Sequence, residues 1–266
     1  MYQQLKKTYW ALKKNYPILF LGSYIRVRYR NWHFQKYLGR TKDLPEFCNG
    51  IYSKTFGIHD NKKSQKWVQY LAPYDRVVDE LFATFGNEVS LLEIGIQSGG
   101  SIEIWRKVFG PNARVVGIDI DKNCADLNLP AEVYIGDSSD SDFLNLIQKK
   151  DQPFNLVIDD GSHDSKHQKK AFENLFPLLS NDGIYIVEDT EHSYYWSKHG
   201  GYFRRSSFIN STKRLVDQMH QQYFLFPAIS GFNVDAQTIK SITFHSGMVI
   251  FRKGTPVKSR IIETST

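Results

Sequence analysis

The stretch Glu93-Ile-Gly-Ile-Gln-Ser-Gly-Gly-Ser101 directly follows the apolar run 89–92. An apolar strand that leads into a glycine-rich turn and then a helix is typical of the first unit of a nucleotide-binding α/β fold. Glycine in such a turn lets the backbone approach a ligand at the carboxyl end of the strand. The stretch therefore predicts an α/β domain with a ligand site beside Gly95.

The sequence on both sides of this stretch alternates strands and helices. The apolar strand segments are too continuous for a sheet with one solvated face, so they predict a mostly parallel, doubly wound sheet with helices on both faces. A tight connector at Gly247 joins the last two strands into an antiparallel hairpin. The expected strands are 89–94, 115–120, 132–135, 154–158, 184–187, 239–244 and 248–252, and the expected helices are 65–86, 101–109, 140–150 and 165–180.

Length and composition limit the classes of protein to consider. The chain has 266 residues, of which 41% are hydrophobic and 14% aromatic, so a large core can form and disorder is excluded as the main state. Two cysteines exclude a disulfide scaffold and a cysteine-rich zinc module. We expect an extension with a connector over 1–64, the main domain over 65–256 and a tail over 257–266.

The positive net charge of +6 belongs to the N-terminal segment alone. Residues 1–42 hold ten Lys or Arg, ten aromatic residues and no Asp or Glu, whereas the remaining chain has 24 basic and 28 acidic groups. The main domain is therefore not expected to bind nucleic acid. Residues 1–42 suit either a membrane-interface element or a helical extension packed on the main domain or on a second subunit. The expected location is cytoplasmic, with peripheral contact at the inner face of the membrane under the first interpretation.

Acidic residues follow three successive strands. Glu93 ends the first strand, Asp119 ends the second, and Asp137 comes after the third, with Ser138 beside it. Such acids can bind a cationic group, two ribose hydroxyls and an adenine amino group, which together favour S-adenosylmethionine. The dinucleotide fingerprint would need glycine where Gln97 stands, which argues against a nicotinamide cofactor.

A second acidic group follows the fourth and fifth strands. Asp159-Asp160-Gly-Ser-His163 comes after one strand and Glu188-Asp189 after the next. If these strands are neighbours, Asp160, Glu188 and Asp189 can converge and hold Mg²⁺ or Mn²⁺, because unpaired carboxylates repel and hard cations prefer oxygen ligands. His163 would lie at the same pocket as a general base. Ordinary turn chemistry is the alternative explanation of these residues.

These motifs resemble the class I methyltransferases and, more narrowly, the macrolide-sugar O-methyltransferases of the mycinamicin and demethylmacrocin type. The resemblance covers about residues 55–253 and rests on 93–101, 116–121, 136–138, 159–163 and 186–190. It implies a seven-stranded Rossmann-like sheet, metal dependence, a sugar hydroxyl acceptor and a homo-oligomer. The cofactor is then expected to contact Glu93, Gly95, Ser98, Gly99, Ser101, Asp119, Asp137, Ser138 and Asp160.

The predicted function is thus metal-dependent methyl transfer from S-adenosylmethionine to a hydroxyl of a small-molecule or lipid-linked glycoside. Segment 192–202 is rich in aromatic residues and glycine, which suits either an acceptor-binding lid or a surface segment with packed aromatic side chains. Three alternatives stay open: O-methylation of a catechol or phenol, a nicotinamide-dependent oxidoreductase, and a non-enzymatic adaptor that uses residues 1–42.

Overall fold

The computed structural model describes residues 41, 43–148, 153–226, 228–229, 231–255 and 260–264. The chain divides into two compact units, Met1–Asp43 and Leu44–Thr266. Almost all of the basic, aromatic segment 1–42 therefore lies outside the described residues, and so does part of the expected tail. The expected division of the chain at residues 64 and 256 stays a prediction.

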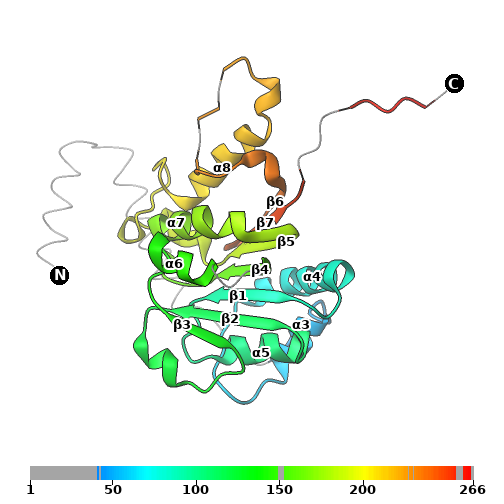
Figure 1. Ribbon diagram of the computed structural model, residues 1–266, viewed down its shortest axis with the longest axis vertical. Helices are drawn as coiled ribbons and strands as arrows, with labels where there is room; N and C mark the ends of the chain where they lie inside the picture. Colours follow the sequence, from blue (N-terminus) through cyan, green and yellow to red (C-terminus); the bar gives the residue numbers. More distant parts are fainter. Residues whose placement is uncertain are drawn as a thin grey trace, which may run out of the picture. The chain divides into compact units, whose positions relative to one another are not determined.

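Seven strands form a single sheet in the order β3-β2-β1-β4-β5-β7-β6 (Figure 1). The first five strands pair in parallel, β7 is antiparallel to β5, and β6 is antiparallel to β7. The strands are β1 (Ser90–Ile94), β2 (Arg114–Asp119), β3 (Glu132–Ile135), β4 (Phe154–Asp159), β5 (Leu179–Val187), β6 (Ile239–His245) and β7 (Met248–Lys253). The predicted α/β class, parallel core and C-terminal hairpin are confirmed.

The helices cover both faces of this sheet because successive strand residues point to opposite sides. Leu91 packs in one core cluster with residues of α3 (Ile51–Gly57), α4 (Val68–Phe85) and α5 (Gly100–Phe109). Leu92 packs in the other cluster with residues of α6 (Ser141–Gln148), α7 (Ser165–Leu175) and α8 (Phe208–Met219). The acidic residues that the sequence singled out lie at, or just after, the carboxyl ends of the five parallel strands β1 to β5.

Several local boundaries differ from the sequence-based expectation. Residues 51–57, expected within a loop-rich connector, form α3, and Tyr52 of this helix is fully buried against Tyr74 and Trp105. The helix expected over 165–180 ends at Leu175, and β5 begins at Leu179 rather than at 184. Pro177, in a short 3₁₀ turn, explains this early end because proline lacks the amide hydrogen of a helix interior. Within the described residues, no helix is long and apolar enough to cross a membrane.

Candidate functional site

The glycine turn after β1 packs tightly against the end of β4. Gly95 has φ +87°, and a Cβ there would lie 2.3 Å from the carbonyl oxygen of Asp160. The amide of Asp160 donates to the carbonyl of Ile94 at 3.0 Å, which fixes the two strand ends side by side. Only glycine satisfies both the left-handed backbone and this close approach. The turn at Gly95 thus adjoins the acidic loop after β4.

Asp119, the predicted ribose-binding residue, accepts hydrogen bonds from two neighbouring loops. Its carboxylate accepts from the amide of Gln97 at 3.0 Å and from the amide of Asp121 at 2.9 Å. One side chain therefore holds the glycine turn and the loop after β2 together. Asp137, after β3, accepts from the amide of Ser139 at 2.8 Å, and this hydrogen bond lowers the pKa of the Asp137 carboxyl.

The other predicted cofactor residues lie around the same turn. Ser98 is exposed, whereas Gly99 and Ser101 are buried at the beginning of α5. Glu93 is fully buried at the end of β1, and this burial raises the pKa of its carboxyl to about 7. The nearby Lys66 ammonium opposes that shift.

Asp160 and Glu188 lie at the ends of the neighbouring strands β4 and β5, and both carboxylates contact the side chain of Lys66. The ammonium nitrogen of Lys66 lies 2.5 Å from Asp160 Oδ2 and 2.5 Å from Glu188 Oε1. The Lys66 and Glu188 side chains are each only 2% exposed. Burial and repulsion from Asp160 raise the pKa of the Glu188 carboxyl, and the charge of Lys66 counteracts this. No motif in the sequence marks Lys66, because its two partners lie 94 and 122 residues away along the chain.

The first turns of α4 supply hydroxyl and indole donors to the acids after β5. Tyr74 donates its hydroxyl hydrogen to Glu188, and Trp67 donates from its indole nitrogen to Asp189 Oδ1 at 3.0 Å. The Tyr70 hydroxyl lies 2.9 Å from Asp189 Oδ1 and accepts from the Asp189 amide at 3.2 Å. These three aromatic side chains recur at helical spacing in the sequence, and that spacing gives no sign of their polar contacts.

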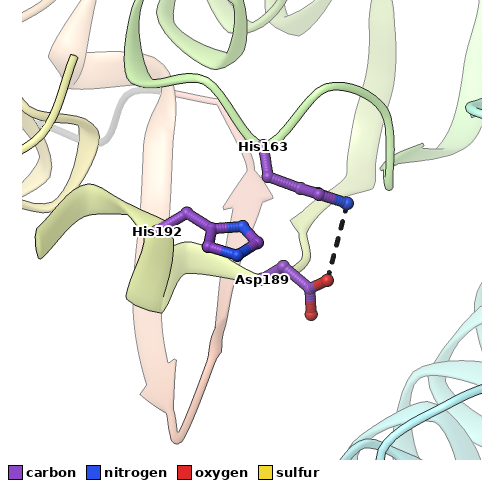
Figure 2. A group of neighbouring side chains, drawn as sticks. All are labelled: His163, Asp189 and His192. Atoms are coloured by element: carbon purple, nitrogen blue, oxygen red, sulfur yellow. Dashed lines mark ion pairs between the residues drawn. The ribbon is translucent and has the colours of Figure 1, made fainter. Parts of the chain in front are cut away.

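His163, Asp189 and His192 form a second group at the same edge of the sheet (Figure 2). Each offers one ligand atom, and these atoms lie within 4.8 Å of one another; within the described residues no other group of three acidic, histidine or cysteine side chains does so. His163 Nε2 lies 3.5 Å from Asp189 Oδ2, and the centres of the two imidazole rings are 5.2 Å apart. Asp189 therefore lies beside the predicted base.

The loop that carries His163 is fastened to the aromatic segment after β5. Lys198, in the 3₁₀ turn η4 (Trp196–Lys198), donates to the carbonyl of Ser162 at 2.7 Å. His199 Nδ1 lies 2.6 Å from Asp164 Oδ2. These contacts hold the residues on both sides of His163, whose φ of +52° is unfavourable for a residue with a side chain. We call this pair of contacts the η4 clasp.

The donor set fits a hard divalent cation. Asp160 and Glu188 both contact the Lys66 ammonium, and Asp189 follows Glu188 directly. The Nδ1 atoms of His163 and His192 are buried and have no hydrogen-bond partner within the described residues, so the neighbouring imidazole pair also has free ligand capacity. Carboxylate oxygens suit Mg²⁺ or Mn²⁺, whereas imidazole nitrogen suits softer metals. Of the three predicted metal ligands, Asp160 and Glu188 thus contact the same lysine, and Asp189 lies beside His163.

Known proteins similar in sequence to this chain are methyltransferases. Residues 92–190 match a family described as the methyltransferase domain. The chain is 32% identical over 200 residues to 8-demethyl-8-alpha-L-rhamnosyl tetracenomycin-C 2'-O-methyltransferase of Streptomyces olivaceus, covering 71% of this chain and 52% of that protein. It is 30% identical over 221 residues to mycinamicin VI 2''-O-methyltransferase of Micromonospora griseorubida, covering 78% of this chain and 52% of that protein. The chain therefore spans about half the length of these curated relatives.

A solved structure shares the fold. The MycE methyltransferase of the mycinamycin biosynthetic pathway, in complex with Mg and SAH, superposes with a TM-score of 0.65 at 26% identity. The match covers 83% of this chain and 56% of that chain. The described sheet, with its parallel core and antiparallel C-terminal strands, has the architecture of that relative.

Proposed function

We propose that this chain, which has the class I methyltransferase fold and resembles the macrolide-sugar O-methyltransferases, moves a methyl group from S-adenosylmethionine to a hydroxyl of a sugar or glycoside. The observation that carries the proposal is the position of Asp160, Glu188 and His163 at one edge of the sheet, beside the glycine turn. The matched methyltransferase domain includes all three residues. This match also favours methyl transfer over the nicotinamide alternative.

S-adenosylmethionine would lie along the carboxyl ends of β1, β2 and β3. Asp119 would accept hydrogen bonds from the ribose hydroxyls, and Asp137 with Ser138 would contact the adenine. Glu93 and Asp160 would face the cationic methionine end, next to Gly95, Gly99 and the two serines Ser98 and Ser101. The buried Glu93 carboxylate supports this assignment, because a cationic ligand stabilises an ionised group there.

Asp160, Glu188 and Asp189 would hold one Mg²⁺ or Mn²⁺. A bound divalent cation supplies Lewis acidity that makes an acceptor hydroxyl more acidic. Trp67 and Tyr70 hold Asp189 Oδ1 by donated hydrogen bonds and leave Oδ2 on the side of His163. A relative of the same fold solved in complex with Mg supports the binding of a divalent metal.

His163 would take the proton from the acceptor hydroxyl while the methyl group is transferred. It lies at the mouth of the acidic group and is 18% exposed, so an acceptor can reach it. Asp189 lies near His163 Nε2 and would stabilise the imidazolium that forms. Alignment of the hydroxyl with the methyl group supplies much of the rate in such reactions.

The acceptor would contact the aromatic segment after β5. His192, in the 3₁₀ turn η3 (Thr190–Tyr194), has its ring 5.2 Å from that of Tyr195, and Trp196 and Tyr202 are substantially exposed. Exposed aromatic faces suit the apolar faces of sugar rings. The names of the relatives support a sugar hydroxyl, and we retain a catechol or phenol as the other acceptor class. A homo-oligomer and a lipid-linked acceptor also remain predictions.

The test is methyl transfer to matched panels of glycosides and catechols, with chelator and with restored Mg²⁺ or Mn²⁺. We expect transfer to glycosides that chelator abolishes and either cation restores. Full activity in chelator would refute the metal assignment, and transfer to catechols alone would refute the acceptor class. Metal titration of Asp160→Asn and His192→Ala locates the ligands: the proposal requires that only the first variant loses affinity, whereas the reverse would place the metal in the His163–Asp189–His192 group.

A further inference from the structure

Lys66 places a positive charge between two of the proposed metal ligands. It belongs to the segment before α4, more than 90 residues from Asp160 in the sequence. Its ammonium nitrogen contacts one oxygen of Asp160 and one of Glu188 at 2.5 Å each, and its side chain is 2% exposed. A lysine so deeply buried is stable only if its charge is paired. The two carboxylates provide that pairing.

The position of this ammonium is incompatible with a metal ion on the same two oxygens. Mg²⁺ requires oxygen ligands at about 2.0–2.1 Å and a nearly octahedral arrangement. A nitrogen already 2.5 Å from both oxygens occupies the space between them. Two cations so close would also repel each other strongly in this buried setting. Lys66 and a metal ion therefore cannot both contact Asp160 Oδ2 and Glu188 Oε1.

We infer that Lys66 is a resident counter-ion that competes with the divalent metal for Asp160 and Glu188 and thereby sets the metal affinity. The inference rests on the proposed metal site and extends it to a residue that does not bind the metal. Without metal, Lys66 neutralises two carboxylates that would otherwise repel each other. When metal binds, the ammonium must leave, and the cost of breaking both contacts weakens the observed affinity.

Neighbouring contacts show why the acids would keep their positions after Lys66 leaves. The Tyr74 hydroxyl donates to the Glu188 carboxylate, and the side-chain amide of Gln168 donates from Nε2 to the Glu188 backbone carbonyl at 3.1 Å. The Asp160 amide is bound to the Ile94 carbonyl at 3.0 Å. The backbone at both acids is thus held by the sheet and by Gln168 of α7, and the Glu188 side chain is also held by Tyr74 of α4, without Lys66. Removing the Lys66 charge should therefore free the site for metal without dismantling it.

The test is titration of the metal-free, full-length protein with Mn²⁺, followed by the electron paramagnetic resonance signal of free Mn²⁺. Lys66→Met should bind Mn²⁺ about tenfold or more tightly than the wild type, because no ammonium has to be displaced. Lys66→Arg, which keeps the charge, should stay close to the wild type. Lys63→Met is the matched control, since Lys63 is an exposed lysine in the same segment.

A second measurement covers the case in which Lys66→Met folds poorly. Lys66→Gln, which keeps hydrogen-bonding capacity, should show a larger rise in melting temperature with Mn²⁺ than the wild type, since tighter binding stabilises the folded state more. Equal or weaker Mn²⁺ binding by both variants would overturn the inference and leave the metal site in place. Failure of the wild type and both variants to bind Mn²⁺ would overturn the inference together with the proposed metal site.

Discussion

Glu93 is a carboxylate whose burial changes its behaviour with pH. It is fully buried, and its pKa is raised from an ordinary value near 4.5 to about 7. The native state therefore keeps a proton that the unfolded chain has released, so the free energy of unfolding falls as pH rises between these two values. The fall is at most about 1.4 kcal/mol per pH unit.

Glu93→Gln should remove this part of the pH dependence, because glutamine has no proton to lose. Denaturant unfolding of the two proteins from pH 4.5 to pH 8, without ligand, measures the difference. The free energy of unfolding of the wild type should fall relative to that of the variant as pH rises toward 7. Above pH 7 the difference between the two proteins should become constant. Parallel curves over the whole range would show that Glu93 titrates normally.

Asp119→Ala should weaken binding of S-adenosylmethionine by about 2–4 kcal/mol, since charge-assisted hydrogen bonds to the ribose are lost. Part of this loss would come from the glycine turn, because Asp119 also accepts from the amide of Gln97. Calorimetric titration measures the effect. Asp121→Ala is the matched control, an acid of the same loop that accepts from Asn123. An unchanged affinity for Asp119→Ala with a loss for Asp121→Ala would move the ribose site to Asp121.

His163→Ala should keep cofactor and metal binding but lower turnover by about 10²–10⁴, the usual contribution of a positioned base. Single-turnover methyl transfer with saturating cofactor measures the chemical step. His220→Ala serves as the control, because His220 caps the end of α8 and its ring nitrogen Nδ1 contacts the carbonyl of Val216 in the same helix. Normal turnover in His163→Ala would transfer the role of base to His192, whose ring is adjacent.

The sequence revealed the acids of this site but not the residues that hold them. Asp160 and Glu188 were predictable because each directly follows an apolar strand, and neighbouring parallel strands end at one edge. His163 was predictable because it lies three residues after Asp160 in the same loop. Tyr70 and Tyr74 have the spacing of one helix face in the sequence, which does not reveal that their hydroxyls contact Asp189 and Glu188. Spacing reports which face of a helix is buried, whereas the partner of a polar atom depends on packing between distant segments.

At the scale of elements, the η4 clasp should control how well the base is positioned. Lys198→Met combined with His199→Gln removes both contacts to the loop 162–164. We expect turnover to fall about tenfold with cofactor affinity unchanged, because a loosened base reduces the rate of the step it assists. The same kinetics on Lys213→Met, an exposed lysine of α8, provide the control. A change in acceptor KM alone would make the clasp part of the acceptor site.

Strands were easier to predict than the segments between them. The ends of β1, β3 and β7 agree with expectation to within one residue, because apolar runs bounded by glycine or charge are distinctive. Helix α3 was missed because it has only 7 residues and its burial depends on Tyr52 meeting the rings of α4 and α5. Helix α8 was missed although its N-cap Ser207 accepts from the amide of Asn210, which is a signal visible in the sequence.

At the scale of the whole molecule, contact with an anionic membrane surface is one of the two interpretations of the basic and aromatic residues 1–42, and it can be tested. Each basic residue near such a surface contributes about 1 kcal/mol, and this segment has ten with no acidic residue. Removing it should abolish sedimentation with anionic vesicles and leave cofactor affinity unchanged, since Leu44–Thr266 is a compact unit of its own. Full-length protein that ignores anionic vesicles at low salt would assign the segment to subunit or domain packing instead.

The contacts between α4 and the acids of β5 have a consequence for the order in which the chain can be assembled. Tyr70 lies 119 residues from Asp189 and also contacts the carbonyl of Gly247, in the turn between the last two strands. During synthesis, α4 leaves the ribosome well before Asp189 and Gly247 are added to the chain. The Tyr70 hydroxyl can reach the Gly247 carbonyl only after the hairpin of β6 and β7 has been synthesised and has paired with β5. The set of contacts around the Tyr70 hydroxyl is therefore complete only after the β6–β7 hairpin has joined the sheet, and contacts of such long sequence separation are formed slowly.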